Sequence, residues 1–245
     1  MTRPCVLVLA GLDPSGGAGL LADAEAIRAT GARPLCVATA LTVQTTRAAR
    51  RFVLVDPAVV AESARALLEE EDVRAVKIGM IGGPAVADAV ASALERHRRL
   101  PRVVDPILAA SSGASLFDGP LSTARDAYLR LASGALLTPN APEAGALLGI
   151  DRLDDPLAAA ALLGKGAAAV LLKGGHLSGN PTDFLFRPEG VERFSEPRIP
   201  VVARGTGCRL ASGLAAGLAL GRSLRDAVIA ARTLVREYLQ AHLSV

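Results

Sequence analysis

Residues 203–218 read ARGTGCRLASGLAAGL, a glycine-rich turn that runs directly into a stretch of small residues. Gly205 and Gly207 allow positive φ and close backbone approach, so the N–H groups of residues 205–208 can converge on an anion at the N-terminus of a helix. Cys208 falls in the first turn of that helix, where the positive end of the macrodipole favours a thiolate. The alternative interpretation is a buried structural helix with an inert cysteine, because a short glycine motif is a weak signal on its own.

The composition is that of a globular protein with one core. The 245 residues are 51% hydrophobic and 21% charged, which favours one domain over residues 1–245. Only 3% of the residues are aromatic and the 27 basic residues are scattered among 24 acidic ones, so no nucleic-acid partner is expected. Three cysteines without a CxxC pair favour a reducing cytoplasm. No apolar run reaches the roughly 18 residues that a membrane span needs, so no membrane partner is expected either.

Apolar runs bounded by turn signals alternate with amphipathic segments along the chain. Strands are expected at residues 5–10, 35–41, 52–55, 75–79, 102–105, 136–138 and 168–172. Helices are expected at residues 17–30, 57–70, 84–98, 120–131, 140–148, 156–164 and 223–242, and a small hairpin is expected near 182–194. This alternation predicts an α/β fold in which one central, mostly parallel β-sheet is flanked by helices on both faces.

Polar residues follow the predicted strands at their carboxyl ends, where α/β sheets bind ligands. Asp105 ends one strand and Glu143 opens the helix after another, so the two carboxylates together could hold a hydrated Mg²⁺. Lys173 follows an apolar strand and precedes two glycines, which favours a phosphate ligand over a solvated charge. Asn140 and Glu143 also have the spacing of a helix capping box, which needs no functional explanation.

A second glycine-rich loop, residues 11–19, joins the first predicted strand to the first helix. Its spacing is neither that of a dinucleotide fingerprint nor that of a Walker loop. Asp13 and Asp23 are candidate site residues, with a turn or cap role for Asp13 and a helix-surface position for Asp23 as the alternatives. Gln44 offers both a donor and an acceptor to a planar heterocycle. Met80 could cover a ring or simply fill the core.

Taken in order, these segments resemble the hydroxymethylpyrimidine and phosphomethylpyrimidine kinases of thiamin biosynthesis, within the ribokinase-like superfamily. The resemblance is carried by residues 10–23, 40–46, 77–80, 104–106, 137–143, 172–176 and 205–208. Each segment is a weak match by itself, whereas their order along nearly the whole chain is highly specific. The resemblance implies a single-domain ribokinase-like fold, with ATP as phosphoryl donor and Mg²⁺ as cofactor.

The resemblance also implies roles for individual residues. The pyrimidine would bind near Gly11, Asp23, Gln44 and Met80. The anion hole would be formed by Gly205, Thr206, Gly207 and Cys208. Asn140 and Lys173 would bind ATP, and Asp105 and Glu143 would hold the metal ion. The catalytic residues would be Lys173 and Cys208, with Cys208 in the place where sugar kinases of this superfamily carry an Asp base.

The chain departs from the family pattern in two places. The family usually has a Thr-His pair before the Gly-Thr-Gly-Cys turn and a small hydroxyl residue after it, whereas this chain has Ala203, Arg204 and Arg209. Leu21 stands where the family commonly has Gln. These changes bear on the orientation of the substrate more than on phosphate binding.

The expected function is ATP-dependent phosphorylation of 4-amino-5-hydroxymethyl-2-methylpyrimidine, and also of its monophosphate, by a cytoplasmic homodimer. A pyridoxal or pyridoxine kinase of the same fold is one alternative. A catalytically silent pyrimidine-binding protein is another. The loop near Ser111 is a candidate lid over the site.

Gln44 separates the pyrimidine interpretation from the pyridoxal one. An aminopyrimidine presents a ring nitrogen acceptor beside an exocyclic NH₂ group, and one carboxamide can pair with both, whereas a pyridoxal ring lacks the amino group. Since an unpaired buried polar group costs about 1–3 kcal/mol, Gln44→Leu is expected to lower kcat/KM for the aminopyrimidine roughly 5- to 150-fold and to change pyridoxal much less. Equal losses for both substrates would mean that Gln44 only shapes the pocket.

Overall fold

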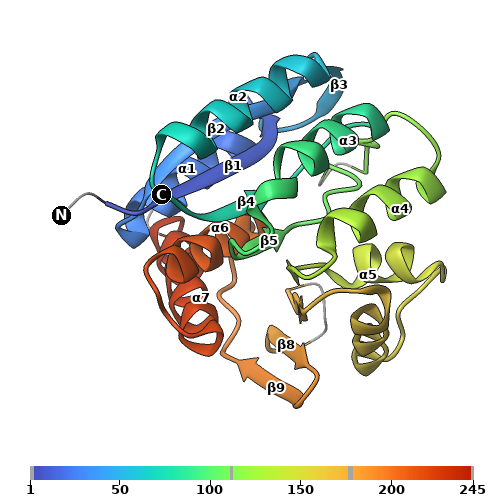
Figure 1. Cartoon of the computed structure of the whole chain (residues 1–245). Coiled ribbons are helices and arrows are strands. Elements are labelled where there is room, and N and C mark those ends of the chain that lie inside the picture. Colours follow the sequence, from blue (N-terminus) through green and yellow to red (C-terminus); the bar gives the residue numbers. More distant parts are fainter. Residues whose placement is uncertain (1–2, 111–112, 176–178, 244–245) are drawn as a thin grey trace.

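The computed structural model describes residues 3–110, 113–175 and 179–243. In this part of the chain nine strands form one sheet in the order β3-β2-β1-β4-β5-β6-β7-β8-β9 (Figure 1). The strands are β1 (Cys5–Leu12), β2 (Arg33–Gln44), β3 (Ala49–Leu54), β4 (Val73–Ile78), β5 (Arg102–Val104), β6 (Leu136–Leu137), β7 (Ala169–Leu172), β8 (Thr182–Arg187) and β9 (Gly190–Ser195). The strands from β2 to β7 in this order pair in parallel, while β3, β8 and β9 are antiparallel. The predicted mostly parallel sheet and the hairpin are therefore confirmed.

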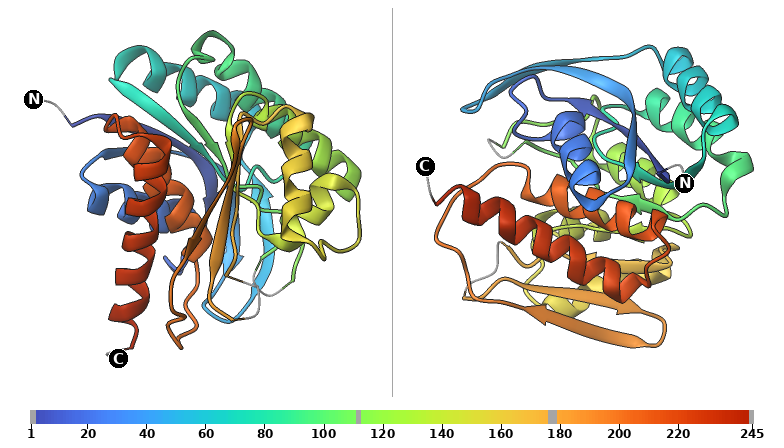
Figure 2. Two further views of the ribbon diagram at one scale, coloured as in Figure 1. Left: turned by 90° about the horizontal axis from the view of Figure 1, so that it is seen from below. Right: turned by 90° about the vertical axis from the view of Figure 1, so that its left-hand side faces the viewer.

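Helices cover both faces of the sheet. They are α1 (Gly19–Thr30), α2 (Pro57–Glu70), α3 (Pro84–Ala93), α4 (Leu121–Ala132), α5 (Ala141–Leu148), α6 (Thr206–Ala219) and α7 (Leu224–Ala241), with the 3-10 helices η1 (Glu95–His97) and η2 (Pro156–Lys165). Figure 2 shows the red helices α6 and α7 on one side of the sheet and the green-to-yellow helices on the other. Every described helix is too short or too polar to cross a lipid bilayer.

The central strand β1 shows how the two layers are held. Its residues alternate between the two faces, as strand geometry requires. Cys5, Leu7 and Leu9 pack with α2, α3, α4 and α5, whereas Val6, Val8 and Ala10 pack with α1, α6 and α7. Because both faces are buried, the strand is a continuous apolar run instead of an alternating one.

Several element boundaries differ from the sequence-based prediction. Strand β2 continues to Gln44, because its end pairs with β3 as an antiparallel ribbon that the pattern of the sequence does not reveal. The predicted helix 84–98 ends at Ala93 and is followed by η1, and the predicted helix 156–164 is the 3-10 helix η2. Helix α1 begins at Gly19 because residues 13–18 form a turn.

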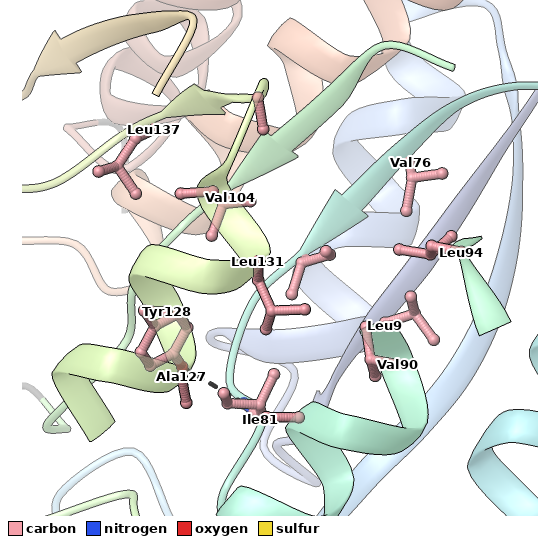
Figure 3. Close-up of a cluster of buried hydrophobic side chains, with 14 of the residues drawn as sticks. Leu9, Val76, Ile81, Val90, Leu94, Val104, Ala127, Tyr128, Leu131 and Leu137 are labelled. Atoms are coloured by element: carbon pink, nitrogen blue, oxygen red, sulfur yellow. Dashed lines mark hydrogen bonds between the residues drawn. The ribbon is translucent and has the colours of Figure 1, made fainter. Parts of the chain in front are cut away.

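Tyr128 of α4 ties the ends of two strands together. The side chain is fully buried among the residues of Figure 3. Its hydroxyl accepts a hydrogen bond from Ile81 N at 3.3 Å and lies 3.1 Å from Gly79 O and 3.0 Å from Ile107 O. One side chain therefore fixes the segments that follow β4 and β5, and both segments carry candidate site residues.

Removing the Tyr128 hydroxyl should weaken this connection. Tyr128→Phe leaves Ile81 N–H without a buried acceptor, and we expect the free energy of unfolding to fall by about 1–3 kcal/mol. Urea unfolding followed by far-UV circular dichroism measures the change. Tyr238→Phe is the matched control, because the Tyr238 hydroxyl is half-buried and water can replace its bond to Arg204 O. Equal losses in both variants would contradict a special role for Tyr128.

Candidate active site

The candidate site lies at the carboxyl edge of the parallel strands. The residues that follow β1, β4, β5, β6 and β7 and the last residue of β2 reach this edge together, as parallel pairing requires. Helix α6 packs against β1, β4 and β5. Predicted site residues from distant parts of the sequence are thereby brought together.

Lys173 is the centre of the charged half of this site. Its Nζ lies 2.6 Å from Asp105 Oδ1 and 3.4 Å from Glu143 Oε2. Burial alone would lower the pKa of Lys173, but the two carboxylates outweigh burial and hold the pKa above its usual range. The ammonium is therefore charged, and it contacts two carboxyl groups at once.

The backbone around Lys173 is fixed on both sides. Lys173 N donates to Pro139 O at 2.8 Å. The next amide, Gly174 N, donates to Asp183 Oδ1 at 2.7 Å, and Arg232 of α7 pairs with the same carboxylate. A Cβ at Gly174 would lie 1.9 Å from a carbonyl oxygen of β8, so only glycine fits there. The lysine is held by rigid elements, which suits a group that must meet a ligand in one position.

Asn140 and Glu143 form the capping box of α5. Glu143 N donates to Asn140 Oδ1 and Asn140 N donates to Glu143 Oε2, both at 2.8 Å. Burial raises the pKa of Glu143, and the Lys173 ammonium opposes that shift. The capping box confirms the structural interpretation of these two residues. It leaves the roles of Asn140 in ATP binding and of Glu143 in metal binding as predictions.

The described residues contain no cluster of three or more histidine, cysteine, aspartate or glutamate side chains able to hold a metal. Asp105 and Glu143 both reach Lys173 Nζ, which shows that the two carboxylates face the same point. Such a pair fits Mg²⁺, which binds few protein carboxylates and keeps its other positions for water and phosphate oxygens. A metal that needs three or more protein ligands would not fit this pair.

The turn before α6 has the geometry of an anion site. Gly205 has a φ of 69° and precedes the helix. Arg209 N makes the first helical hydrogen bond, to Gly205 O at 2.9 Å, so the N–H groups before it have no acceptor within the helix. A Cβ at Gly207 would lie 3.3 Å from Lys173 Nζ. The helix N-terminus and the ammonium are therefore neighbours, and an anion could contact both.

Cys208 lies in the first turn of α6, as predicted, and its side chain is buried. Burial raises the pKa of the Cys208 thiol to about 11, and the Lys77 ammonium opposes this only in part. The thiol is therefore protonated at neutral pH. The expectation that the macrodipole favours a thiolate is wrong for the resting protein, because desolvation is the larger effect.

The part of the site in which a phosphoryl acceptor would bind, called the acceptor half below, has an apolar wall. Met80 forms a small buried cluster with Ala40 and Leu116, and Phe52 and Ile107 pack against it. A Cβ at position 11 of β1 would lie 2.6 Å from the Met80 sulfur, so a larger residue there would displace the Met80 side chain. This arrangement brings Gly11 and Met80 together as predicted, although their contact with a pyrimidine remains a prediction.

Gln44 and Asp13 form the polar end of the acceptor half. Gln44 Nε2 donates to Asp13 Oδ2 at 3.2 Å. Two residues earlier on the same face of β2, Thr42 Oγ1 donates to Leu12 O at 2.9 Å. The end of β2 is therefore attached to the loop after β1, and the turn role considered for Asp13 is confirmed by its bonds to the amides of Ser15 and Ala18.

Asp23 is not on the helix surface, which makes that alternative wrong. It is fully buried, pairs with Lys77 Nζ at 2.8 Å and accepts a hydrogen bond from Ser212 Oγ at 2.8 Å. Burial alone would lower the pKa of Lys77, but Asp23 outweighs burial and raises the pKa to about 12. This pair joins α1, β4 and α6. The sequence contained one signal for this buried pair, a lysine inside an apolar strand. The role of Asp23 in substrate binding stays a prediction.

The two arginines that depart from the family pattern are both engaged. Arg204 donates to Thr45 O at 2.8 Å and pairs with Asp13 Oδ2 at 3.3 Å. Arg209 is buried, pairs with Glu25 at 2.6 Å and stacks its guanidinium 3.8 Å from the centre of the Tyr238 ring. The sequence does not predict these contacts, because the partners come from other parts of the chain.

Other predictions fall outside the site. Leu21, which replaces a glutamine common in the family, is 47% exposed on α1. Ser111 of the candidate lid and His176 of one family segment lie outside the described residues.

Comparison with known proteins agrees with the resemblance. A sequence model of the family described as phosphomethylpyrimidine kinase matches residues 13–245. A hydroxymethylpyrimidine/phosphomethylpyrimidine kinase of Salmonella typhimurium is 40% identical over 223 residues, which are 88% of this chain and 83% of that protein. A thiamine biosynthesis bifunctional protein of Geobacter sulfurreducens is 41% identical over 236 residues, which are 94% of this chain. The matched part is 48% of the Geobacter protein, so the chain spans about half the length of that relative.

Solved structures share the whole fold. The crystal structure of phosphomethylpyrimidine kinase from Clostridium difficile superposes with a TM-score of 0.83 at 29% identity, covering 97% of this chain and 100% of that one. The pyridoxal kinase from Staphylococcus aureus in complex with pyridoxal superposes with a TM-score of 0.87 at 25% identity, covering 98% and 89%. Both substrate classes considered from the sequence thus occur among proteins of this shape.

The buried Asp23–Lys77 pair generates a stability prediction. Asp23→Ala leaves the Lys77 ammonium buried without a partner, and we expect the free energy of unfolding to fall by about 3–5 kcal/mol. The double variant Asp23→Leu with Lys77→Met removes both charges and should recover most of that loss. Urea unfolding measures both.

The exposed pair of Asp88 and Arg130 supplies the control, because Asp88→Ala should cost about 1 kcal/mol or less. A double variant as unstable as Asp23→Ala alone would show that the loss comes from packing and not from an unpaired charge.

Proposed function

The chain belongs to the phosphomethylpyrimidine kinase family, and we propose that it transfers a phosphoryl group from ATP to the hydroxymethyl group of 4-amino-5-hydroxymethyl-2-methylpyrimidine, and then to the resulting monophosphate. The enzyme is a phosphotransferase whose relatives are named for these reactions. Phosphoryl transfer depends on positioning and charge neutralisation more than on covalent catalysis, and the residues of this site could supply both.

One observation carries the proposal. Lys173 lies beside the N-terminus of α6 on one side of the site, while Gln44 and the apolar wall of Met80 lie on the other. At this edge of the sheet, Lys173 and the N-terminus of α6 could bind an anionic phosphoryl donor. Gln44 and Met80 could bind a planar, partly polar acceptor. The anion hole of residues 205–208 would lie between them, where the transferred group passes.

The donor half would bind Mg-ATP. We propose that Asn140 and Lys173 contact the nucleotide and that Asp105 and Glu143 hold Mg²⁺ through water or directly. When bound, Mg²⁺ neutralises phosphate charge. Lys173 adds a second positive charge whose position is fixed by its backbone contacts, and the amides of residues 205–208 add oriented dipoles without any reorganisation.

The acceptor half would hold the pyrimidine ring against Gly11 and Met80, with Gln44 at its polar edge and Asp23 beneath. Cys208 would take the hydroxyl proton or hold it for transfer. Its raised pKa means that the ionised form is rare in the free protein at neutral pH.

We propose further that residues 1–245 act as one domain in a cytoplasmic homodimer without nucleic-acid or membrane partners. The three cysteines are unpaired, which suits a reducing compartment. Leu41 and Val53 face each other across the β2–β3 ribbon and are about half exposed, with Val43 beside them. Such an apolar patch suits contact with a second copy.

A pyridoxal kinase is the second candidate function. The observation that favours it is the close superposition with the Staphylococcus aureus pyridoxal kinase. A protein that binds the pyrimidine without consuming ATP is the third.

A coupled ATPase assay with the aminopyrimidine, pyridoxal and ribose distinguishes these functions. We expect turnover of the aminopyrimidine to exceed that of the other two. Turnover of pyridoxal alone would replace the proposal with the second candidate, and turnover of ribose alone would exclude both. Calorimetric binding of the pyrimidine without ATP consumption would establish the third.

The role of Cys208 predicts a characteristic pH profile. Since the thiol ionises near pH 11, the ionised fraction and kcat/KM should rise about tenfold per pH unit between pH 8 and pH 10. Cys208→Ala should lower the rate about 10²- to 10⁴-fold and abolish the rise.

Cys36→Ala, which removes an exposed thiol, is the control and should behave like the wild type. Near-normal turnover of Cys208→Ala would assign Cys208 to packing.

A further inference from the structure

Asp13 accepts an unusual number of hydrogen bonds for a residue in a surface-facing loop. The residue is only 3% exposed. Oδ1 accepts from Ser15 N at 2.9 Å and from Ser15 Oγ at 2.7 Å. Oδ2 accepts from Ala18 N at 3.1 Å, from Gln44 Nε2 at 3.2 Å and from the Arg204 guanidinium at 3.3 Å. Five donors from four residues therefore converge on one carboxylate.

This set of donors determines which end of the Gln44 carboxamide faces Asp13. An ionised carboxylate only accepts hydrogen bonds, so it binds the NH₂ group of Gln44 and repels the carbonyl oxygen. The amides of Ser15 and Ala18 and the Arg204 guanidinium already donate to both Asp13 oxygens, so Asp13 faces Gln44 as an acceptor. The flipped carboxamide would place two oxygens against each other.

The remaining atoms of the Gln44 carboxamide present one hydrogen-bond acceptor and one donor in a fixed order. One N–H is bonded to Asp13, which leaves the carbonyl oxygen and the second N–H for a ligand. A carboxamide in this orientation pairs with an amino group beside a ring-nitrogen acceptor, as glutamine does with adenine. The flipped order would pair with an oxo group beside a ring N–H.

The backbone that carries Gln44 is also held in place. Thr42 and Gln44 share one face of β2, and the Thr42 bond to Leu12 O holds that face against the loop. The β2–β3 register shifts between Val43 and Gln44 because β3 carries the extra residue Arg50, so β3 is locally bent beside Gln44. With the strand held, the bond from Gln44 Nε2 to Asp13 Oδ2 is the contact that orients the carboxamide.

We propose that Asp13 is a positioning residue that makes the acceptor pocket specific for 4-aminopyrimidines over 4-oxopyrimidines, by holding the Gln44 carboxamide in one orientation. This inference rests on the proposed function, since it names the acceptor chemistry that the same pocket selects. It assigns the selectivity to a residue that would not itself touch the ring.

The test compares two acceptors that differ only at this edge. They are 4-amino-5-hydroxymethyl-2-methylpyrimidine and its 4-oxo analogue, with Kd from calorimetry and kcat/KM from the coupled assay. The wild type should favour the amino compound roughly 10- to 100-fold, because the oxo compound places its oxygen against the Gln44 carbonyl.

Asp13→Asn is the informative variant. Asparagine has nearly the same size but can offer either a donor or an acceptor, so Gln44 is free to flip. The preference should fall to within about threefold, with weaker binding of the amino compound and tighter binding of the oxo compound. A structural role alone would weaken both compounds equally, and an unchanged ratio overturns the proposal.

Asp56→Asn is the matched control, because Asp56 is an exposed cap of α2 and asparagine caps a helix equally well. The preference of Asp56→Asn for the amino compound over the oxo compound should equal that of the wild type. Should Asp13→Asn fail to fold, the wild-type ratio still decides, since equal Kd values for the two compounds overturn the proposal.

The outcomes separate this inference from the proposed function. Turnover of the aminopyrimidine with an unchanged ratio in Asp13→Asn overturns only the role of Asp13. Turnover of pyridoxal without turnover of the pyrimidine overturns the proposed function. The ratio of the Kd values for the 4-amino and 4-oxo compounds then still tests whether Asp13 orients the Gln44 carboxamide. Binding of neither pyrimidine overturns both.

Discussion

The close approach of two glycine backbones, Gly17 and Gly205, is the constraint on which the site depends. A Cβ at Gly205 would lie 2.1 Å from Gly17 O, and the φ of 69° at Gly205 disfavours any other residue as well. Asp13, the partner of Gln44, belongs to the loop of Gly17, and the anion-binding amides belong to the turn of Gly205. Their contact therefore brings a recognition surface from the beginning of the chain against a phosphate-binding surface from its end.

Two lysines of the molecule have different electrostatic surroundings. Lys77 is fully buried with a single carboxylate, Asp23, which balances its charge. Lys173 faces two carboxylates, Asp105 and Glu143, and its side chain is 12% exposed. A balanced buried pair fixes the relative position of the elements that it joins, at little net gain in stability. A partly exposed lysine with two carboxyl partners is able to exchange one of them for another ligand, which is what a site for Mg²⁺ and phosphates requires.

The sequence predicts the fold well because it contains the physical information that determines the fold. Buried parallel strands need apolar residues on both faces, and β1 shows them as a continuous run. The residue types at the strand ends also predict that Lys173, Asp105 and Glu143 meet. The sequence does not predict the burial of Asp23 or the pKa of Cys208, since both depend on which elements cover a residue. It also misses the partners of Arg204, which come from two other loops.

Arg204 and Arg209 show how the departures from the family pattern fit this molecule. Each guanidinium is paired with a carboxylate: Arg204 with Asp13, and Arg209 with Glu25. Neither arginine therefore adds an unpaired charge at the N-terminus of α6. Arg204 directly precedes Gly205 and binds the carboxylate that orients Gln44. The segment that places the anion-binding amides thus also supports the polar edge of the acceptor pocket, so a movement of this turn would change ring recognition and phosphate binding together.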